Sequence, residues 1–138
     1  PNAALKGALG GLTKNYRYVL IDSPAGLEHL NRRIVSDVDD IFDLIDSSEK
    51  AFNHVERAHR IAGEVKIAFK NFYVVGGYRF PEGLDGMVEE RTGLKYLGKV
   101  AYDGEVESNV LNGKSLLQVS NTSPAYKSVK EIMKKAGY

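Results

Sequence analysis

Tyr18-Val19-Leu20-Ile21-Asp22-Ser23-Pro24-Ala25-Gly26 is the stretch around which the fold is expected to form. Four apolar or aromatic residues run directly into an aspartate, and Ser-Pro-Ala-Gly then breaks the chain. A short continuous apolar run is typical of a strand that is buried on both faces, as in a parallel sheet. The residues leave two interpretations open. Asp22 could meet a ligand at the carboxyl end of its strand, with Gly26 letting the backbone approach a phosphate. Alternatively, the segment is an ordinary turn in which Asp22 caps backbone amides.

The composition is that of a globular protein with one core. The chain has 138 residues, of which 43% are hydrophobic and 27% are charged. A net charge of +1 argues against a surface dedicated to nucleic acid. The absence of cysteine excludes disulfides and thiolate metal sites. Because no apolar run approaches the roughly 20 residues that span a bilayer, and no leader follows Pro1, we expect no membrane partner and a cytoplasmic location.

Apolar spacing and turn residues predict strands that alternate with helices along the whole chain. This alternation predicts an α/β fold, a parallel sheet with helices on both faces, formed as one unit over residues 1–138. The expected strands are 17–22, 41–45, 71–77 with a Gly-Gly turn at its end, and 96–101. The expected helices are 3–14, 27–34, a long helix from Ser47 or Ser48 to about Glu64, a helix from Pro81 to a stop at Gly93, one capped by Asp103 that ends at Asn112-Gly113, and one from Ser123-Pro124 to Ala136, with a loop over 114–122.

Two polar features need an explanation within this pattern. Asp43 lies in the middle of an apolar strand, where an unpaired carboxylate is costly, so either the strand has an exposed face or Asp43 has a partner. His54 and His59 are five residues apart on the long helix, whereas side chains on one helical face are three or four apart. We therefore predict no metal site.

The order of these motifs resembles a known family. Tyr16-Arg17 and the stretch 18–26 look like the Walker B strand and switch II of the MinD/ParA group of P-loop ATPases. The continuation Gly26-Leu27-Glu28-His29-Leu30-Asn31-Arg32-Arg33 resembles CooC, the ATPase that inserts nickel into carbon monoxide dehydrogenase. The segments 93–103, 112–117 and 123–125 match later parts of the same family, so the resemblance covers essentially the whole chain.

The resemblance implies a P-loop NTPase-like fold and a set of functional residues. Asp22 and Gly26 would be catalytic, Asp22 by positioning the water bound to magnesium and Gly26 by sensing the γ-phosphate. The nucleotide, ATP with magnesium, would be held by Ser23, Pro24, Ala25, Gly77, Ala101, Tyr102 and Asp103. The family acts as a dimer that sandwiches nucleotide, so Glu28, His29, Arg32 and Arg33 would form a partner surface, and carbon monoxide dehydrogenase would be the target.

The chain departs from this family in informative ways. It has no Gly-rich phosphate loop, so we expect the chain to be the C-terminal half of such an ATPase, without the N-terminal half that carries the P-loop. We expect this chain alone to be inactive and to hold no cofactor by itself. Gly76-Gly77-Tyr78-Arg79 stands where the family has Asn, and Ala101-Tyr102-Asp103 where it usually has Pro. The alternatives are a MinD/ParA positioning ATPase and a degenerate, non-catalytic interaction protein on the same scaffold.

The absence of the N-terminal half would leave the sheet of the family incomplete. In the family the phosphate-loop strand lies between the strands that match 17–22 and 39–45, so its absence leaves two apolar edges unpaired. The strands could close up, a second copy could fill the gap as a homodimer, or the missing half could occupy it. We therefore expect self-association or rearrangement near residues 17–45, with residues 71–136 keeping the family arrangement.

Overall fold

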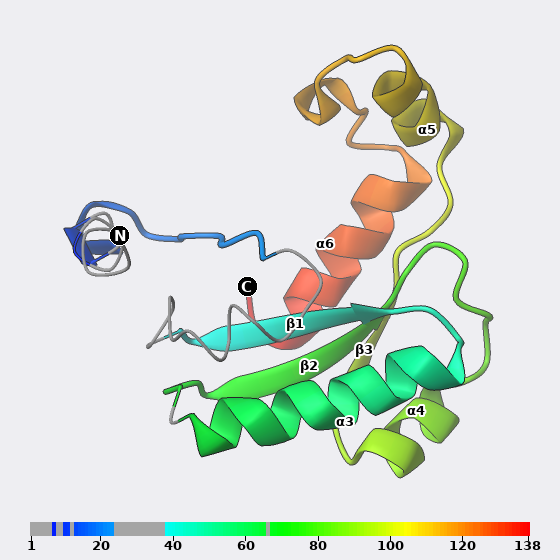
Figure 1. Ribbon diagram of the computed structural model, residues 1–138. Helices are drawn as coiled ribbons and strands as arrows, with labels where there is room; N and C mark the ends of the chain where they lie inside the picture. The colour runs from blue at the N-terminus through cyan, green and yellow to red at the C-terminus, as the bar shows by residue number, and fades with distance from the viewer. Residues whose placement is uncertain (1–6, 8–9, 12, 24–37, 66) are drawn as a thin grey trace. The chain divides into compact units, whose positions relative to one another are not determined.

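The computed structural model describes residues 7, 10–11, 13–23, 38–65 and 67–138 (Figure 1). Two compact units are distinguished within the chain, and each is described by itself. One comprises Pro1–Asp40 with Arg57–Asn71, and the other comprises Ile41–Glu56 with Phe72–Tyr138. The boundary between the units passes through two strands and one helix rather than between elements. The single unit expected over residues 1–138 stays a prediction.

A parallel sheet is the centre of the described structure. Its strands are β1 (Asp40–Ile45), β2 (Asn71–Gly76) and β3 (Lys95–Lys99), in the order β1-β2-β3. β2 and β3 are parallel, with Tyr73 opposite Lys95 and Val74 opposite Tyr96. β1 and β2 run the same way, because the Asp39 oxygen accepts from the Asn71 amide at one end and the Ile45 oxygen from the Gly77 amide at the other. The predicted α/β class with a parallel sheet is confirmed.

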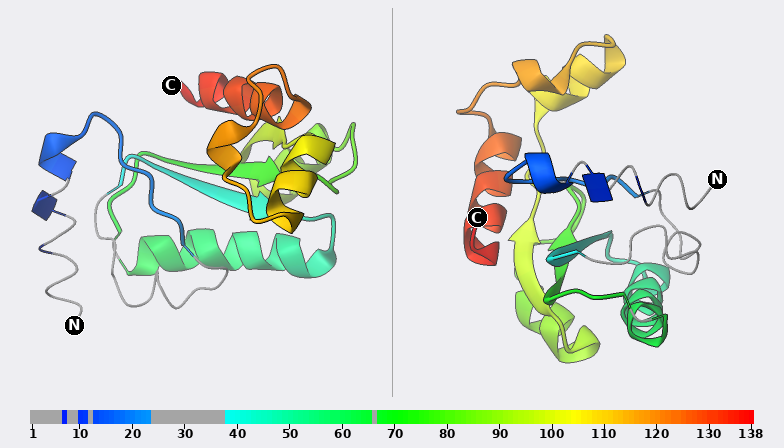
Figure 2. Two further views of the ribbon diagram at one scale, coloured as in Figure 1. Left: turned by 90° about the horizontal axis from the view of Figure 1, so that it is seen from above. Right: turned by 90° about the vertical axis from the view of Figure 1, so that its left-hand side faces the viewer.

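Helices cover both faces of this sheet (Figure 2). The helices are α3 (Glu49–Glu64), α4 (Asp85–Thr92), α5 (Gly104–Leu111) and α6 (Pro124–Ala136), with short 3-10 helices η1 (Thr13–Asn15) and η2 (Leu116–Gln118). α6 packs on one face, and α4 and the first half of α3 on the other. Arg91 of α4 binds both carboxylate oxygens of Glu49, and its guanidinium lies 4.5 Å from the ring centre of Phe52, so it ties α4 to α3.

The core follows from the alternation of side chains along β2, the central strand. Tyr73 and Val75 pack with Leu97 and Ile132 on the α6 side. Phe72 and Val74 are buried on the opposite side. A strand that is apolar on both faces fits only the middle of a sheet with two helical layers, which is where β2 lies.

Several predicted helix ends are confirmed. Ser48 rather than Ser47 caps α3, since its hydroxyl accepts from the Ala51 amide. Gly93 ends α4 in the left-handed conformation, with φ of 67°. The predicted start of α4 is wrong. The helix begins at Asp85 rather than at Pro81, because Gly83 has φ of +76°, which a helix cannot contain. The expected loop over 114–122 contains η2.

The predicted strand over 17–22 is also wrong, because Arg17 lies in a bend and residues 18–22 form neither helix nor strand. Tyr18 is 58% exposed and Leu20 is 89% exposed. A segment with this apolar composition becomes a strand only when neighbouring strands supply hydrogen-bond partners for its backbone and helices cover both of its faces. None of the described residues pairs with residues 17–22 as a strand. In the predicted helix over 3–14, Gly7, Gly10 and Gly11 are helical, and residues 13–15 form η1. The predicted helix over 27–34 lies outside the described residues.

Asp43 is half-buried in β1, and burial raises the pKa of its carboxyl, while the charge of His54 on α3 partly lowers it. The structure thus supplies the partner that the sequence required. A carboxyl whose pKa is raised by folding contributes stability that is fully present below its unfolded pKa and is lost as the pH rises through the folded pKa.

Asp43→Asn is therefore expected to raise the melting temperature at pH 7 by roughly 2–4 °C, and the gain should vanish near pH 4, where the wild-type carboxyl is protonated. Thermal unfolding between pH 4 and 8 measures this. In a His54→Gln background the gain should be larger, because the attraction to His54 that lowers the pKa of Asp43 is gone. A gain that does not change with pH would show that burial of the charge is not the cause.

Candidate functional site

The carboxyl ends of β1, β2 and β3 meet at one edge of the sheet because the strands are parallel (Figure 1). Asp46 follows β1, residues 77–80 follow β2, and residues 100–103 follow β3. Ligands of open parallel α/β sheets bind outside the carboxyl ends of the strands. This edge is therefore the candidate functional site of the described structure.

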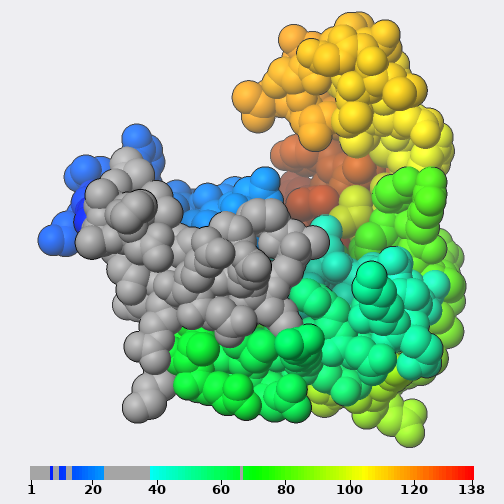
Figure 3. All heavy atoms as spheres, viewed as in Figure 1, coloured from blue at the N-terminus to red at the C-terminus, as the bar shows by residue number. Residues whose placement is uncertain are grey.

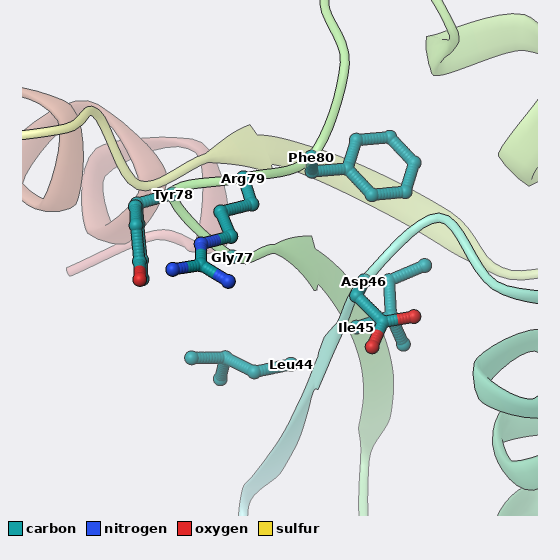
Figure 4. Close-up of a pocket in the computed structure, with 7 residues that line it drawn as sticks. All are labelled: Leu44, Ile45, Asp46, Gly77, Tyr78, Arg79 and Phe80. Atoms are coloured by element: carbon teal, nitrogen blue, oxygen red, sulfur yellow. The ribbon is translucent and has the colours of Figure 1, made fainter.

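A hollow of about 300 Å³ lies at this edge. Its lining residues come from the ends of β1 and β2 and are Leu44, Ile45, Asp46, Gly77, Tyr78, Arg79 and Phe80. Figure 4 shows the side chains of Tyr78 and Arg79 side by side and directed toward the side of Leu44, whereas the Phe80 ring points away from them. Phe80 is buried and packs against Tyr96, with ring centres 5.6 Å apart. The volume is at the lower end of the range for small-molecule sites.

Three planar groups adjoin one another at this edge. The guanidinium of Arg79 lies 5.3 Å from the ring centre of Tyr78, and the rings of Tyr78 and Tyr102 have centres 6.2 Å apart with planes inclined at 43°. Tyr78 is 49% exposed and Tyr102 is 57% exposed. The Tyr102 hydroxyl donates to Glu107 Oε2 at 2.7 Å, and this bond holds the Tyr102 ring against α5. The hydrogen bond and charge of Glu107 raise the pKa of Tyr102, so its hydroxyl stays protonated at neutral pH.

Asp103 joins the starts of two helices. Its Oδ1 accepts from the amides of Glu105 and Val106 at the start of α5, and its Oδ2 accepts from the Ala125 amide at the start of α6. The Ser123 hydroxyl is a further partner, and these bonds hold the pKa of Asp103 below its usual value. The cap that the sequence predicted for α5 is confirmed, and the same side chain also caps α6. With both oxygens used, the carboxylate has a structural role.

Backbone amides at this edge also have partners. The Gly77 amide donates to the Ile45 oxygen at 2.8 Å, the Val100 amide to the Gly76 oxygen at 2.8 Å, and the Ala101 amide to Ser128 Oγ at 2.9 Å. These bonds hold the ends of the three strands and the start of α6 together. The amides of Gly77, Val100 and Ala101 are therefore used within the protein.

The structure brings some of the expected site residues together. Gly77, Ala101, Tyr102 and Asp103 all lie at the carboxyl edge of the sheet, as the resemblance implied. Asp22 and Ser23 are exposed residues of the other unit. Pro24, Ala25, Gly26, Glu28, His29, Arg32 and Arg33 lie outside the described residues. Binding and catalytic roles for all of these remain predictions.

The resemblance implies that side chains near Gly77-Tyr78 border the base, but the sequence pattern assigns no individual role to Tyr78, Arg79 or Leu44. Tyr78 and Arg79 directly follow the Gly-Gly turn of β2, which is the position of ligand contacts in such sheets. That place in the sequence is the signal that could have found them. The pairing of Tyr78 with Tyr102 has no such signal, because the sequence does not encode the distance between two loops.

Among residues 7, 10–11, 13–23, 38–65 and 67–138, no cluster of three or more His, Asp or Glu side chains could hold a metal ion. Within the same described ranges, none of the helices has the length and apolar character needed to cross a membrane.

The sequence is similar to two curated proteins of Methanocaldococcus jannaschii, and no protein-family model matches it. It is 34% identical to the uncharacterized ATP-binding protein MJ0685 over 137 residues, which are 97% of this chain and 54% of that protein. It is 30% identical to the uncharacterized ATP-binding protein MJ0823 over 124 residues, which are 88% of this chain and 46% of that protein. The chain thus spans about half the length of these curated relatives.

Proposed function

We propose that this chain is the C-terminal half of an ATP-binding protein and forms the part of the nucleotide site that contacts the base. The observation that carries the proposal is the similarity of 97% of the chain to a protein named as ATP-binding and about twice as long. The carboxyl edge of the sheet supports it, because exposed aromatic rings there suit a planar base. The part that holds the phosphates would lie in the other half, since this sequence contains no Gly-rich phosphate loop.

Exposed apolar side chains support the proposal that the chain is part of a longer protein. η2 packs against α5, and in the space-filling view these segments, yellow to orange, stand beyond the end of α6 (Figure 3). Their side chains Leu111 and Leu117 are 80% and 97% exposed, and Leu20 of the other unit is 89% exposed. Exposed apolar surface of this kind marks sites that another protein segment covers.

For the complete protein we propose ATP hydrolysis that drives insertion of nickel into carbon monoxide dehydrogenase. This rests on the resemblance of residues 16–33 to CooC. In that role Asp22 positions the water bound to magnesium and Gly26 senses the γ-phosphate. The homodimer, with Glu28, His29, Arg32 and Arg33 near the partner subunit, belongs to the same proposal. CooC carries a Cys-x-Cys metal motif, which in the complete protein would lie before Pro1. A MinD/ParA positioning ATPase would share the nucleotide site but lack this motif.

Titration calorimetry with Mg-ATP tests whether the nucleotide site is divided between this chain, which contacts the base, and the other half of the protein, which holds the phosphates. A protein of the relatives' length that contains these 138 residues is expected to bind Mg-ATP with micromolar affinity and to release phosphate. The isolated chain is expected to show no measurable binding, because a base contact alone contributes only about 1–3 kcal/mol. Micromolar binding by the isolated chain would refute the proposed division, and no binding by the longer protein would refute ATP binding itself.

The metal-related role needs a separate test. Deleting the gene of the complete protein in a host that makes carbon monoxide dehydrogenase should leave that enzyme deficient in nickel, and added nickel should restore part of its activity. A fully nickel-loaded enzyme in the deletion strain would reject this role and leave the nucleotide proposal unchanged.

A further inference from the structure

Exposed aromatic side chains, those of Tyr78 and Tyr102, lie at the candidate site. Arg79, Tyr78 and Tyr102 form a continuous run of planar groups, with 5.3 Å between the guanidinium and the first ring and 6.2 Å between the two rings. Arg79 makes no ion pair with any residue in the described part of the chain, so its charge is available to an anionic ligand. Stacking on tyrosine and guanidinium planes is a common way for proteins to hold nucleobases.

In the described structure, four groups that could read the edge of a base at this site are engaged within the protein. The amides of Gly77, Val100 and Ala101 donate within the protein, and the carboxylate of Asp103 accepts bonds from the starts of two helices. Discrimination between adenine and guanine requires hydrogen bonds to the edge, because an amino group in one base corresponds to a carbonyl in the other. Stacking supplies no such discrimination, since every base has a similar face.

We infer that the exposed rings of Tyr78 and Tyr102, extended by Arg79, form the platform on which the nucleotide base stacks, and that the site accepts adenine and guanine nucleotides with similar affinity. This inference rests on the proposed function and adds to it the specificity of the site. Tyr102 is the better-fixed ring, because its hydroxyl is bonded to Glu107 in α5. Tyr78 contacts both Arg79 and Tyr102 and so links the two.

The test compares Mg-ATP, Mg-GTP and inorganic tripolyphosphate by calorimetry, with the natural protein that contains this chain. The wild type should bind ATP and GTP with dissociation constants within about five-fold of each other. Tyr102→Leu and Tyr78→Leu should each weaken both nucleotides roughly ten-fold and leave tripolyphosphate unchanged, because only the base contact is lost. Tyr78→Phe, which keeps the ring, should bind like the wild type.

Tyr138→Leu is the matched control, since Tyr138 is a similarly exposed tyrosine (47%) that follows the C-terminal end of α6, whereas Asp103 contacts the N-terminal end of that helix. It should bind both nucleotides like the wild type, and circular dichroism confirms that each variant is folded. A preference above about 100-fold for one nucleotide would show edge reading and overturn the inference. Unchanged binding in both leucine variants would also overturn it, and either result leaves nucleotide binding itself intact. If the wild type binds neither nucleotide nor tripolyphosphate, the proposed function fails and the inference with it.

Discussion

Gly76→Ala is expected to lower the free energy of unfolding by about 1–3 kcal/mol, the usual cost of forcing extra volume into a packed core. A Cβ at this position would lie 2.5 Å from the Tyr96 hydroxyl and 2.9 Å from Cβ of Phe80. Both neighbours are buried and their rings pack against each other, so neither can move away cheaply. The Gly76 oxygen also accepts from the Val100 amide, which prevents the strand from shifting. Chemical denaturation, with urea as the denaturant, measures the loss.

Gly63→Ala is the matched control for this prediction. Gly63 lies in α3, where an added Cβ meets nothing within 4 Å and the helix gains from alanine. The same chemical change should therefore stabilise the protein by up to about 1 kcal/mol. Opposite signs in the two variants would separate crowding from the general effect of replacing glycine. Equal effects at both positions would show that crowding by Tyr96 and Phe80 is not the cause of the loss.

The Gly76 contact also affects the pKa of Tyr96. Burial and the charge of Asp85 raise the pKa of Tyr96 to about 12, and a backbone hydrogen bond with Gly76 opposes this shift. Folding therefore favours the neutral phenol, and the corresponding stability is present below pH 10 and is lost as the pH rises toward 12. At the end of β2, the small size of Gly76 therefore leaves room for the buried Tyr96 ring, and the Gly76 backbone forms a hydrogen bond with that residue.

The parts of the fold that can be predicted are those with strong local signals. β2 is predictable because an apolar run that ends at Gly76-Gly77 has only one good place in a parallel sheet. α5 and α6 are predictable because Asp103 and Ser123 are strong helix caps, and both act as caps in the structure. In these segments the local preference and the packing agree, so the sequence is sufficient.

The predicted strand over 17–22 fails for a non-local reason. Its residues have the composition of a central strand, but a strand exists only where a neighbouring strand supplies hydrogen bonds. Composition cannot reveal whether that neighbour is present in the chain. The predicted start of α4 fails for a local reason, because Pro81 favours the first turn of a helix but Gly83 adopts a positive φ.

The candidate site is predictable to the level of the sheet edge and not beyond it. The rule that ligands bind at the carboxyl ends of parallel strands locates residues 77 and 101–103. The roles of individual side chains depend on loop geometry, which the sequence pattern does not determine. Asp103 is an example, since its position after β3 does not reveal that its carboxylate joins the starts of two helices.

Asp103→Ala is expected to lower the melting temperature by roughly 5 °C or more, because it removes the caps of α5 and α6 together. The Ser123 hydroxyl and the amides of Ala125, Glu105 and Val106 hold the pKa of Asp103 below its usual value. A carboxyl with a lowered pKa stabilises the protein above its unfolded pKa, and this contribution is lost as the pH falls through the folded pKa. The difference between wild type and variant should therefore be full at neutral pH and shrink below pH 3.8, the ordinary value for aspartate. Hydrogen exchange should show the largest loss of protection in residues 104–118, because the carboxylate connects that segment to α6. Asp85→Ala, which removes an exposed acid from the first turn of α4, should change the melting temperature little. An equal effect of the two substitutions would mean that Asp103 acts through its charge alone and not through the bonds that join the helices.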